Sequence, residues 1–251
     1  MSEKSAPFQF SRRTFGGMAL AACAMPSFAQ AQDGARPTLV ELFTSQGCNA
    51  CPAADALMLK LAADPTMIPL TFATEIWDYL GWKDTLARPA FTRRHKAYAA
   101  GLANRRVYTP QAVVNGRAHC VGSDLTTLTR LKRTAVSSTD SATIALSRSG
   151  TDWDARITRS GSNPARLVLL PVSARRSVEI ERGENMGKTI TYANVVRDII
   201  DLGPASSGTS RIEARRLAGL DADAFALLVQ AGTLEAPGEV FGSTFSGNAE
   251  G

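Results

Sequence analysis

The chain has 251 residues, 44% of them hydrophobic and 20% charged, which suffices for one large globular domain or two small ones. Its formal net charge of +5 is too small and too dispersed to favour binding to nucleic acid, so we expect no nucleic-acid partner. The chain has two histidines, whereas a zinc hydrolase usually needs two or three imidazole ligands at one site, which argues against that class of enzyme.

Residues 1–31 have the pattern of an export signal. Arg12 and Arg13 precede the short apolar stretch "MALAACAMP", and a small-x-small cleavage site follows at Ala29-Gln30-Ala31. The arginine pair resembles a twin-arginine signal, which is an address read by a receptor and not a membrane anchor. We therefore expect a periplasmic or secreted protein.

An alternative interpretation of the same segment is a lipoprotein signal. The stretch "LAAC", which ends at Cys23, resembles the box that precedes a lipid-modified cysteine, and Cys23 would then anchor the chain to a membrane. After the signal, no apolar run reaches the length of about 20 residues that a membrane-spanning helix needs. We expect no transmembrane segment in the mature chain.

The mature chain begins with a strand–helix–strand pattern. The segment "TLVELF" (38–43) is rich in strand-forming residues, residues 52–63 have helical spacing, and "MIPLTFAT" (67–74) indicates a second buried strand. Pro52 suits a first helical turn, where its missing N–H is not needed. This order favours a βαβ unit with parallel strands and a right-handed crossover.

A helical insertion rich in aromatic residues is predicted next. It contains "WDYLGWKD", which we interpret as a segment that packs on the sheet, with a lid near a functional site as the alternative. Within the insertion, Arg93-Arg94-His95-Lys96 is typical of a solvated helix face, and we expect His95 to lie in solvent.

A hairpin and a helix complete the first domain. The strand "QAVV" and a second strand ending at Val121 flank Asn115-Gly116, a strong signal for a two-residue hairpin turn. Ser123 is expected to cap a helix over residues 124–135. Cys120, in the second hairpin strand, is expected to be a buried free thiol.

The remainder of the chain is predicted to be rich in β-structure. After "VSSTDSA", the segments "TIALSR", "WDARITR", "RLVLLPVSARRSVEI" and "AFALLVQ" indicate strands, whereas "TITYANVVRDIIDLG" fits either a strand or a helix. We expect a second domain over residues 140–245. The final residues, 246–251, are expected to form a disordered tail.

Cys48 and Cys51 form a C-x-x-C pair in "SQGCNACP", between the first strand and the first helix. This spacing is used by redox dithiols, by metal sites and by structural disulfides. At a helix N-terminus, unsatisfied N–H groups and the positive end of the helix dipole favour a thiolate over a thiol. In a redox site, Cys48 would be the exposed nucleophile, and Cys51 would be the resolving thiol that attacks a mixed disulfide.

The position of this pair in a βαβ unit, before a later Xaa-Pro, a hairpin and a helix, resembles the thioredoxin fold. The resemblance implies an α/β fold, with a thioredoxin-like βαβ…ββα domain over residues 38–136 that contains the helical insertion and is followed by the β-rich region. It also implies that the Thr109-Pro110 peptide bond is cis and faces the dithiol. The backbone of Thr109 would then pair with a bound substrate peptide.

The motifs "VELFTSQGCNACPAAD", "WDYLGWKD" and "YTPQAVVNGR" together resemble a family of exported bacterial thioredoxin-like proteins of unknown function. The resemblance covers most of the mature chain and is densest between Val40 and Gly122. In that family a histidine and an aspartate precede the second motif. Here Ala73 occupies the position of the histidine and Glu75 stands near that of the aspartate, so any role of the histidine is absent.

The preferred hypothesis is an exported thiol–disulfide oxidoreductase that needs no cofactor and acts on protein or small-molecule disulfides. Its site would contain Cys48, Cys51, Thr109 and Pro110, and its partners would be thiol or disulfide clients, or a redox protein, in the cell envelope. Asp78 and Glu75 are candidate proton acceptors if burial raises their pKa.

Two other functions fit the same cysteines. Soft thiolates suit Cu(I), so Cys48 and Cys51 could be the metal ligands of a thioredoxin-like copper chaperone. Alternatively, the pair could be a structural disulfide in a binding protein whose β-rich half engages a partner in the envelope.

Overall fold

The computed structural model describes residue 1 and residues 36–102, 105–134 and 139–248. The expectations for the export signal and for Cys23 concern residues 2–35, which lie outside the described residues. In the part of the chain that is described, no helix is long and apolar enough to cross a membrane.

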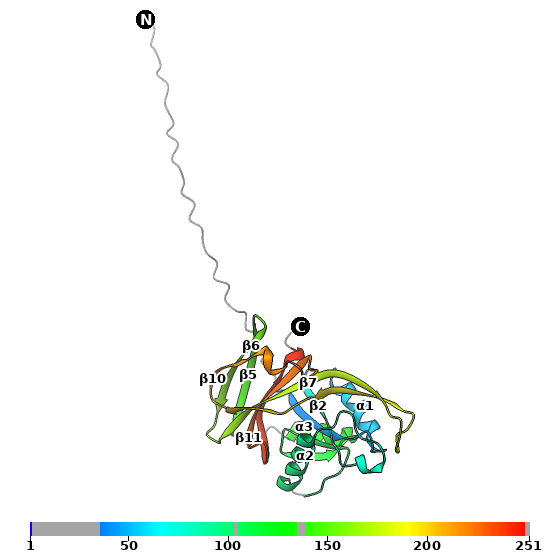
Figure 1. Cartoon of the computed structure of the whole chain (residues 1–251). Helices are drawn as coiled ribbons and strands as arrows, with labels where there is room; N and C mark the ends of the chain where they lie inside the picture. Colours follow the sequence, from blue (N-terminus) through cyan, green and yellow to red (C-terminus); the bar gives the residue numbers. More distant parts are fainter. Residues whose placement is uncertain (2–35, 103–104, 135–138, 249–251) are drawn as a thin grey trace.

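The fold is of the mixed α/β class and contains the predicted elements in the predicted order (Figure 1). The helices are α1 (Pro52–Leu61), α2 (Pro89–Gly101) and α3 (Leu125–Thr134), with short 3-10 helices η1 (Asp78–Leu80), η2 (Ala214–Arg216) and η3 (Ser246–Asn248). The strands are β1 (Thr38–Thr44), β2 (Met67–Ala73), β3 (Gln111–Val114), β4 (Ala118–Val121), β5 (Ser141–Ser149), β6 (Asp152–Ser160), β7 (Ala165–Glu179), β8 (Thr189–Val196), β9 (Ile200–Pro204), β10 (Gly208–Ile212), β11 (Ala224–Gly232) and β12 (Pro237–Phe245).

Strands from both halves of the chain join one nine-stranded sheet. Its order is β12-β11-β7-β8-β2-β1-β3-β4, with β9 paired to β7. β1 is parallel to β2, and β3 is antiparallel to β4, as the βαβ and hairpin patterns predict. β1 is also antiparallel to β3. β5, β6 and β10 form a separate three-stranded sheet. The division of the chain into two domains near residue 140 stays a prediction. In the large sheet, β2 pairs with β8, so the segments before and after residue 140 are joined by strand pairing.

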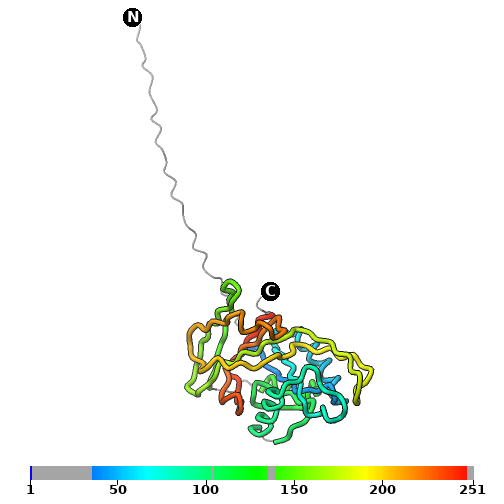
Figure 2. The backbone as a smooth tube through the Cα atoms, viewed as in Figure 1, coloured from blue at the N-terminus to red at the C-terminus, as the bar shows by residue number. Residues whose placement is uncertain are grey.

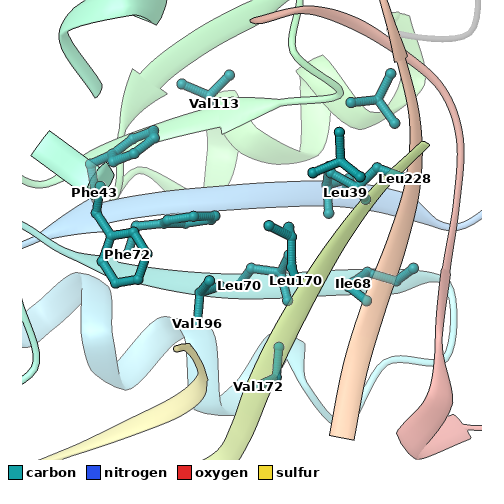
Figure 3. Packing of buried hydrophobic residues seen from close by; sticks show 14 of the residues in the cluster. Leu39, Phe43, Ile68, Leu70, Phe72, Val113, Leu170, Val172, Val196 and Leu228 are labelled. Carbon is teal, nitrogen blue, oxygen red and sulfur yellow. The ribbon is translucent and has the colours of Figure 1, made fainter. Parts of the chain in front are cut away.

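The alternation of side chains in β1 separates the two faces of this sheet. Leu39 and Phe43 face the core beneath α2, whereas Val40 and Leu42 face the helices α1 and α3. Figure 3 shows that the cluster beneath α2 also contains Leu170 of β7 and Leu228 of β11, together with Phe72 of β2. The same hydrophobic core therefore includes side chains from the first and the second half of the chain. The three-stranded sheet packs on the opposite face, over β7 and β11.

β7 and β8 leave the large sheet together as a long hairpin, drawn in yellow tones, which extends past α1 in Figures 1 and 2. β8 pairs with β2 only at Val195, opposite Thr71, whereas its pairing with β7 continues to Thr189. Pro69 of β2 has no N–H, so it cannot donate to a neighbouring strand. The Asn194 side chain instead donates to the Pro69 carbonyl at 2.9 Å. We call residues 178–190, the outer part of this hairpin, the arm.

The face of α2 that was predicted to lie in solvent is buried. His95 is completely buried, with Nε2 2.7 Å from Oε1 of Gln111 and its ring stacked on Phe43 at 4.5 Å between centroids. The prediction was wrong for Arg94 and His95 because both share an inward helical face with Phe91 and Tyr98. Burial lowers the pKa of His95 to about 4, so its ring is neutral at pH 7.

Arg94 forms a buried ion pair that connects three elements. Its Nε lies 2.6 Å from Oε2 of Glu41 in β1. The side chain of Arg94 is 1% exposed to solvent and that of Glu41 is completely buried. The Tyr98 hydroxyl donates to Oε1 of Glu41 at 2.6 Å, and Arg94 Nη2 donates to Oε1 of Gln230 in β11 at 2.9 Å. The network ties β1, α2 and β11 together across the core.

Two chain segments differ in detail from the predictions. The cap of α3 is Asp124 and not Ser123, because Oδ1 of Asp124 accepts from the Thr127 N–H at 2.9 Å. Where the tail was expected to be disordered, residues 246–248 form η3, and the Ser246 hydroxyl accepts from the Phe225 N–H at 2.8 Å. Residues 249–251 of that tail lie outside the described residues.

Replacing Glu41 by glutamine should lower the free energy of unfolding by roughly 3–5 kcal/mol, because Arg94 then keeps a buried charge without a counter-charge. Denaturant unfolding at pH 7 measures this loss. The matched control is Glu239→Gln, which removes the more exposed ion pair with Arg117 and should cost no more than about 1 kcal/mol. Equal small losses in both variants would contradict the assigned role of the buried pair.

Candidate functional site

Cys48 and Cys51 are joined in a disulfide between β1 and α1, with their Cα atoms 5.4 Å apart. Cys51 is the residue that caps α1, and its carbonyl accepts hydrogen bonds from the N–H groups of Ala54 and Asp55 at 2.9 and 3.0 Å. Cys48 is 6% exposed and Cys51 is completely buried. The first sulfur therefore borders the surface at a helix N-terminus, and the second lies inside.

The Thr109-Pro110 segment lies against the disulfide. Its peptide bond is cis, as the resemblance implied, and the carbonyl oxygen of Thr109 lies 3.6 Å from Sγ of Cys48. The structure thus brings together the four site residues predicted from the sequence. Their catalytic roles remain a prediction.

The aromatic insertion packs directly on the loop that carries the disulfide. The Trp77 indole N–H donates to the Thr109 hydroxyl at 2.7 Å, and the Trp82 indole N–H donates to the Gln46 side chain at 2.8 Å. A Cβ atom added at Gly47 would lie only 3.0 Å from Cβ of Trp77, so a larger residue there would push the insertion away from the loop. The insertion is a packing segment that also encloses the disulfide.

The two acidic residues proposed as proton acceptors have other partners. A carboxylate oxygen of Glu75 accepts from the Thr92 hydroxyl at 3.3 Å, and one of Asp78 accepts from the Asp84 N–H at 3.2 Å. Neither hydrogen bond involves a cysteine.

Asp55 is a different acidic group that the sequence analysis did not single out for chemistry. It lies one helical turn after Cys51, its side chain is buried, and neither carboxylate oxygen has a hydrogen-bond partner among the described residues. Burial raises the pKa of Asp55 to about 8 against the lowering effect of the nearby Thr44 hydroxyl, and the charge of Asp84 contributes to the rise. The acid form therefore predominates at pH 7.

Further buried polar atoms surround this acid. The hydroxyls of Thr44 and Tyr192 also lack hydrogen-bond partners in the described part of the chain. Burial raises the pKa of Tyr192, and the charges of Asp55 and Asp84 add to this effect. Tyr192 belongs to β8, so the second half of the chain contributes a buried side chain to the surroundings of Asp55.

Cys120 lies apart from this chemistry. It is buried in the apolar cluster between the sheet and helices α1 and α3, and burial, with the charge of Asp124, raises its pKa to about 11. This agrees with the prediction of a buried free thiol. No group of three or more His, Cys, Asp or Glu side chains within residues 36–102, 105–134 and 139–248 is arranged to hold a metal ion. Within these described residues, the Cu(I) hypothesis therefore depends on the two thiolates of Cys48 and Cys51 without a cluster of further ligands.

Replacing Asp55 by asparagine should change how stability depends on pH. Since the folded pKa of about 8 exceeds the ordinary value of 3.8, the native state keeps a proton that the unfolded chain releases between these values. The wild type should therefore lose up to about 1.4 kcal/mol per pH unit as pH rises in this window. The amide of the variant does not titrate. The stability of D55N relative to that of the wild type should therefore increase as the pH rises from about 5 to about 7.5, a range that lies between the two pKa values.

Denaturant unfolding of the oxidised proteins at several pH values measures this difference. Burial raises the pKa of Asp84 to about 6, so Asp84 titrates in both proteins while the side chain at position 55 is uncharged, and its effect on stability cancels in the comparison. Glu235→Gln, at an exposed loop position, is the control and should leave the pH profile unchanged. A stability difference between D55N and the wild type that does not vary with pH would refute the buried acid.

The chain is similar to a known family and to solved structures. Residues 39–230 match a family described as "Protein of unknown function (DUF1223)". A crystal structure of a protein from Agrobacterium tumefaciens is 28% identical, with a TM-score of 0.71, and the match covers 84% of this chain and 94% of that one. HBP35 of Porphyromonas gingivalis is similar in fold, with 12% identity, a TM-score of 0.56, and coverage of 84% and 74%. No curated protein matches the chain. Because the family match covers most of its length, the chain belongs to the DUF1223 family.

Proposed function

We propose that this chain is an exported thiol–disulfide oxidoreductase with a thioredoxin-like site, in which Cys48 exchanges with a client and Cys51 resolves. The observation that carries the proposal is the buried carboxyl group of Asp55 one turn beyond Cys51, for which no hydrogen bond of ordinary geometry is formed among the described residues. Burying a carboxyl group without partners costs stability, and a static disulfide does not need one. Perturbed acids of this kind are typical of catalytic sites.

The oxidised protein would act on a client that carries two thiols. A client thiolate attacks Sγ of Cys48, a disulfide forms between the client and Cys48, and the Cys48–Cys51 bond breaks. Cys51 leaves as a thiolate and takes the proton of Asp55. The second client thiolate then attacks the client sulfur of the mixed disulfide, which releases Cys48 as a thiolate. Two electrons pass from the client to Cys48 and Cys51.

The reverse sequence reduces a client disulfide. The Cys48 thiolate attacks one client sulfur, which breaks the client disulfide, forms a mixed disulfide and releases the other client sulfur as a thiolate. Cys51 then transfers its proton to the Asp55 carboxylate and attacks Sγ of Cys48, which restores the Cys48–Cys51 bond and releases the first client sulfur as a thiolate. A pKa of about 8 for Asp55 lies in the range in which a carboxyl group can both release and take up a proton near neutral pH. Asp55 is therefore suited to act as the acid in one direction and as the base in the other.

Exposed apolar side chains near the disulfide support a protein client. Tyr79 and Leu80 in the insertion and Met186 in the arm are exposed, at 74%, 39% and 68% respectively. Val107 and Val121 are exposed beside the Thr109-Pro110 segment. These side chains belong to segments that pack around the disulfide loop, so a protein client that reaches Cys48 would meet apolar groups there.

A structural disulfide is the second candidate function. The observation that favours it is the low exposure of the pair, 6% for Cys48 and none for Cys51, because a client sulfur must reach Cys48. In that case the bond would stabilise the loop between β1 and α1 and would take no part in exchange.

Single cysteine variants separate the two functions. Cys48→Ser should reduce exchange with a disulfide-containing reporter peptide to the background rate, because the nucleophile is lost. Cys51→Ser keeps the nucleophile but not the resolving thiol, so it should accumulate a mixed disulfide with the peptide that mass spectrometry detects.

Cys120→Ser is the matched control, since it removes a buried thiol from a different cluster and should leave exchange unchanged. Full activity in Cys48→Ser, or no exchange in the wild type, would overturn the proposed function.

A further inference from the structure

The tip of the arm reaches the loop that carries the disulfide. Asn185 is completely buried, although Glu184 and Met186 on either side are exposed. Its Nδ2 group donates to the carbonyl of Gln46 at 2.9 Å and to the carbonyl of Cys48 at 2.8 Å. A side chain from the second half of the chain thus holds the backbone on both sides of Gly47, next to the nucleophile.

The orientation of the Asn185 amide is fixed from both ends. Two carbonyl acceptors require the NH2 group on the inner side, and the Lys188 ammonium, which can only donate, lies 2.9 Å from Oδ1 on the outer side. A second contact from the arm accompanies this one, since the carboxylate of Glu184 accepts from the Asn49 N–H at 3.3 Å. The arm therefore contacts the backbone of the C-x-x-C segment at two positions.

Apolar packing holds the arm in place. Ile180 and Ile190 belong to a buried cluster with Leu86, and Trp82 of the insertion packs against it. Gly183, with a φ of +79°, turns the chain beside Trp82, where an added Cβ would lie 3.4 Å from Cβ of the tryptophan. The insertion and the arm thus enclose the disulfide loop together.

We propose that Asn185 is a positioning residue of the redox centre, through which the arm keeps the two sulfurs in the geometry of the disulfide and so sets the redox equilibrium of the pair. The inference rests on the proposed function and deepens it. Fixing the loop raises the effective concentration of one thiol at the other, which favours the bond over the open dithiol. When the hydrogen bonds from Asn185 are removed, the loop becomes more mobile, and this mobility destabilises the disulfide more than the dithiol.

The test is the equilibrium between Asn185→Ala and glutathione buffers, followed by mass spectrometry after acid quenching. Removing the Asn185 amide should shift the equilibrium constant with glutathione at least about tenfold toward the dithiol, which is about 30 mV for a two-electron couple. Thr189→Ala, at an exposed position of the arm, is the matched control and should keep the wild-type equilibrium constant. Asn185→Gln, which keeps an amide donor, should recover part of the shift.

A merely structural role gives a different result. Asn185→Ala would then destabilise the oxidised and reduced forms equally, as unfolding of each form measures, and the equilibrium constant would not change. That outcome overturns the inference about Asn185. The proposed function still holds in that case if the wild type exchanges with the client. If the wild type exchanges with no thiol, both fail.

A second variant covers the case in which Asn185→Ala does not fold. Lys188 is exposed, so Lys188→Met should fold while removing the donor that orients the Asn185 amide. It should shift the equilibrium in the same direction by a smaller factor. An equilibrium constant identical to that of the wild type in Lys188→Met would overturn the positioning role.

Discussion

The absence of an N–H on Pro69 shapes the part of the molecule that surrounds the disulfide. The Pro69 carbonyl is directed at β8 and accepts from the side chain of Asn194, but the proline cannot complete a backbone ladder on that side. Asn194 has a φ of +46°, a conformation that asparagine tolerates better than most residues, and β8 pairs with β2 only at Val195. Beyond this point β8 follows β7 instead of β2, and the arm passes α1 (Figure 1). The local interruption of one ladder thus allows the second half of the chain to reach the disulfide.

Both halves of the chain then contribute to a single buried environment. The first half contributes the disulfide, Asp55 and the indole groups of the insertion, whereas β8 and the arm contribute Tyr192 and Asn185. In our account, Asp55 supplies and removes the proton that accompanies each pair of electrons, and Asn185 fixes the loop where the bond forms and breaks. The low exposure of the sulfurs follows from this enclosure. In our account, this enclosed disulfide and the buried acid one helical turn after Cys51 serve coupled proton and electron transfer.

The elements near the cysteines could be predicted because their signals are local. The strand–helix–strand start and Pro52 in the first turn of α1 depend on residues close in sequence, and the structure confirms them. Asn115-Gly116 also turns the predicted hairpin, although three residues, 115–117, lie between the paired Val114 and Ala118. His95 was assigned to solvent because neighbouring charges suggested a polar face, whereas burial is decided by Phe91 and Tyr98 on the same side of the helix. Asp55 could have been found from its spacing of four residues after Cys51. Asn185 could not, because a contact across 137 residues leaves no local pattern.

The central claim is that the Cys48–Cys51 bond opens and closes during function, and its reduction potential tests this most directly. The purified oxidised protein would be equilibrated in glutathione buffers of known potential, and the fraction of dithiol would be measured after acid quenching. Our account predicts a value between about −120 and −270 mV, the range of known exchange catalysts. A value below about −300 mV would identify a structural disulfide and would contradict the account.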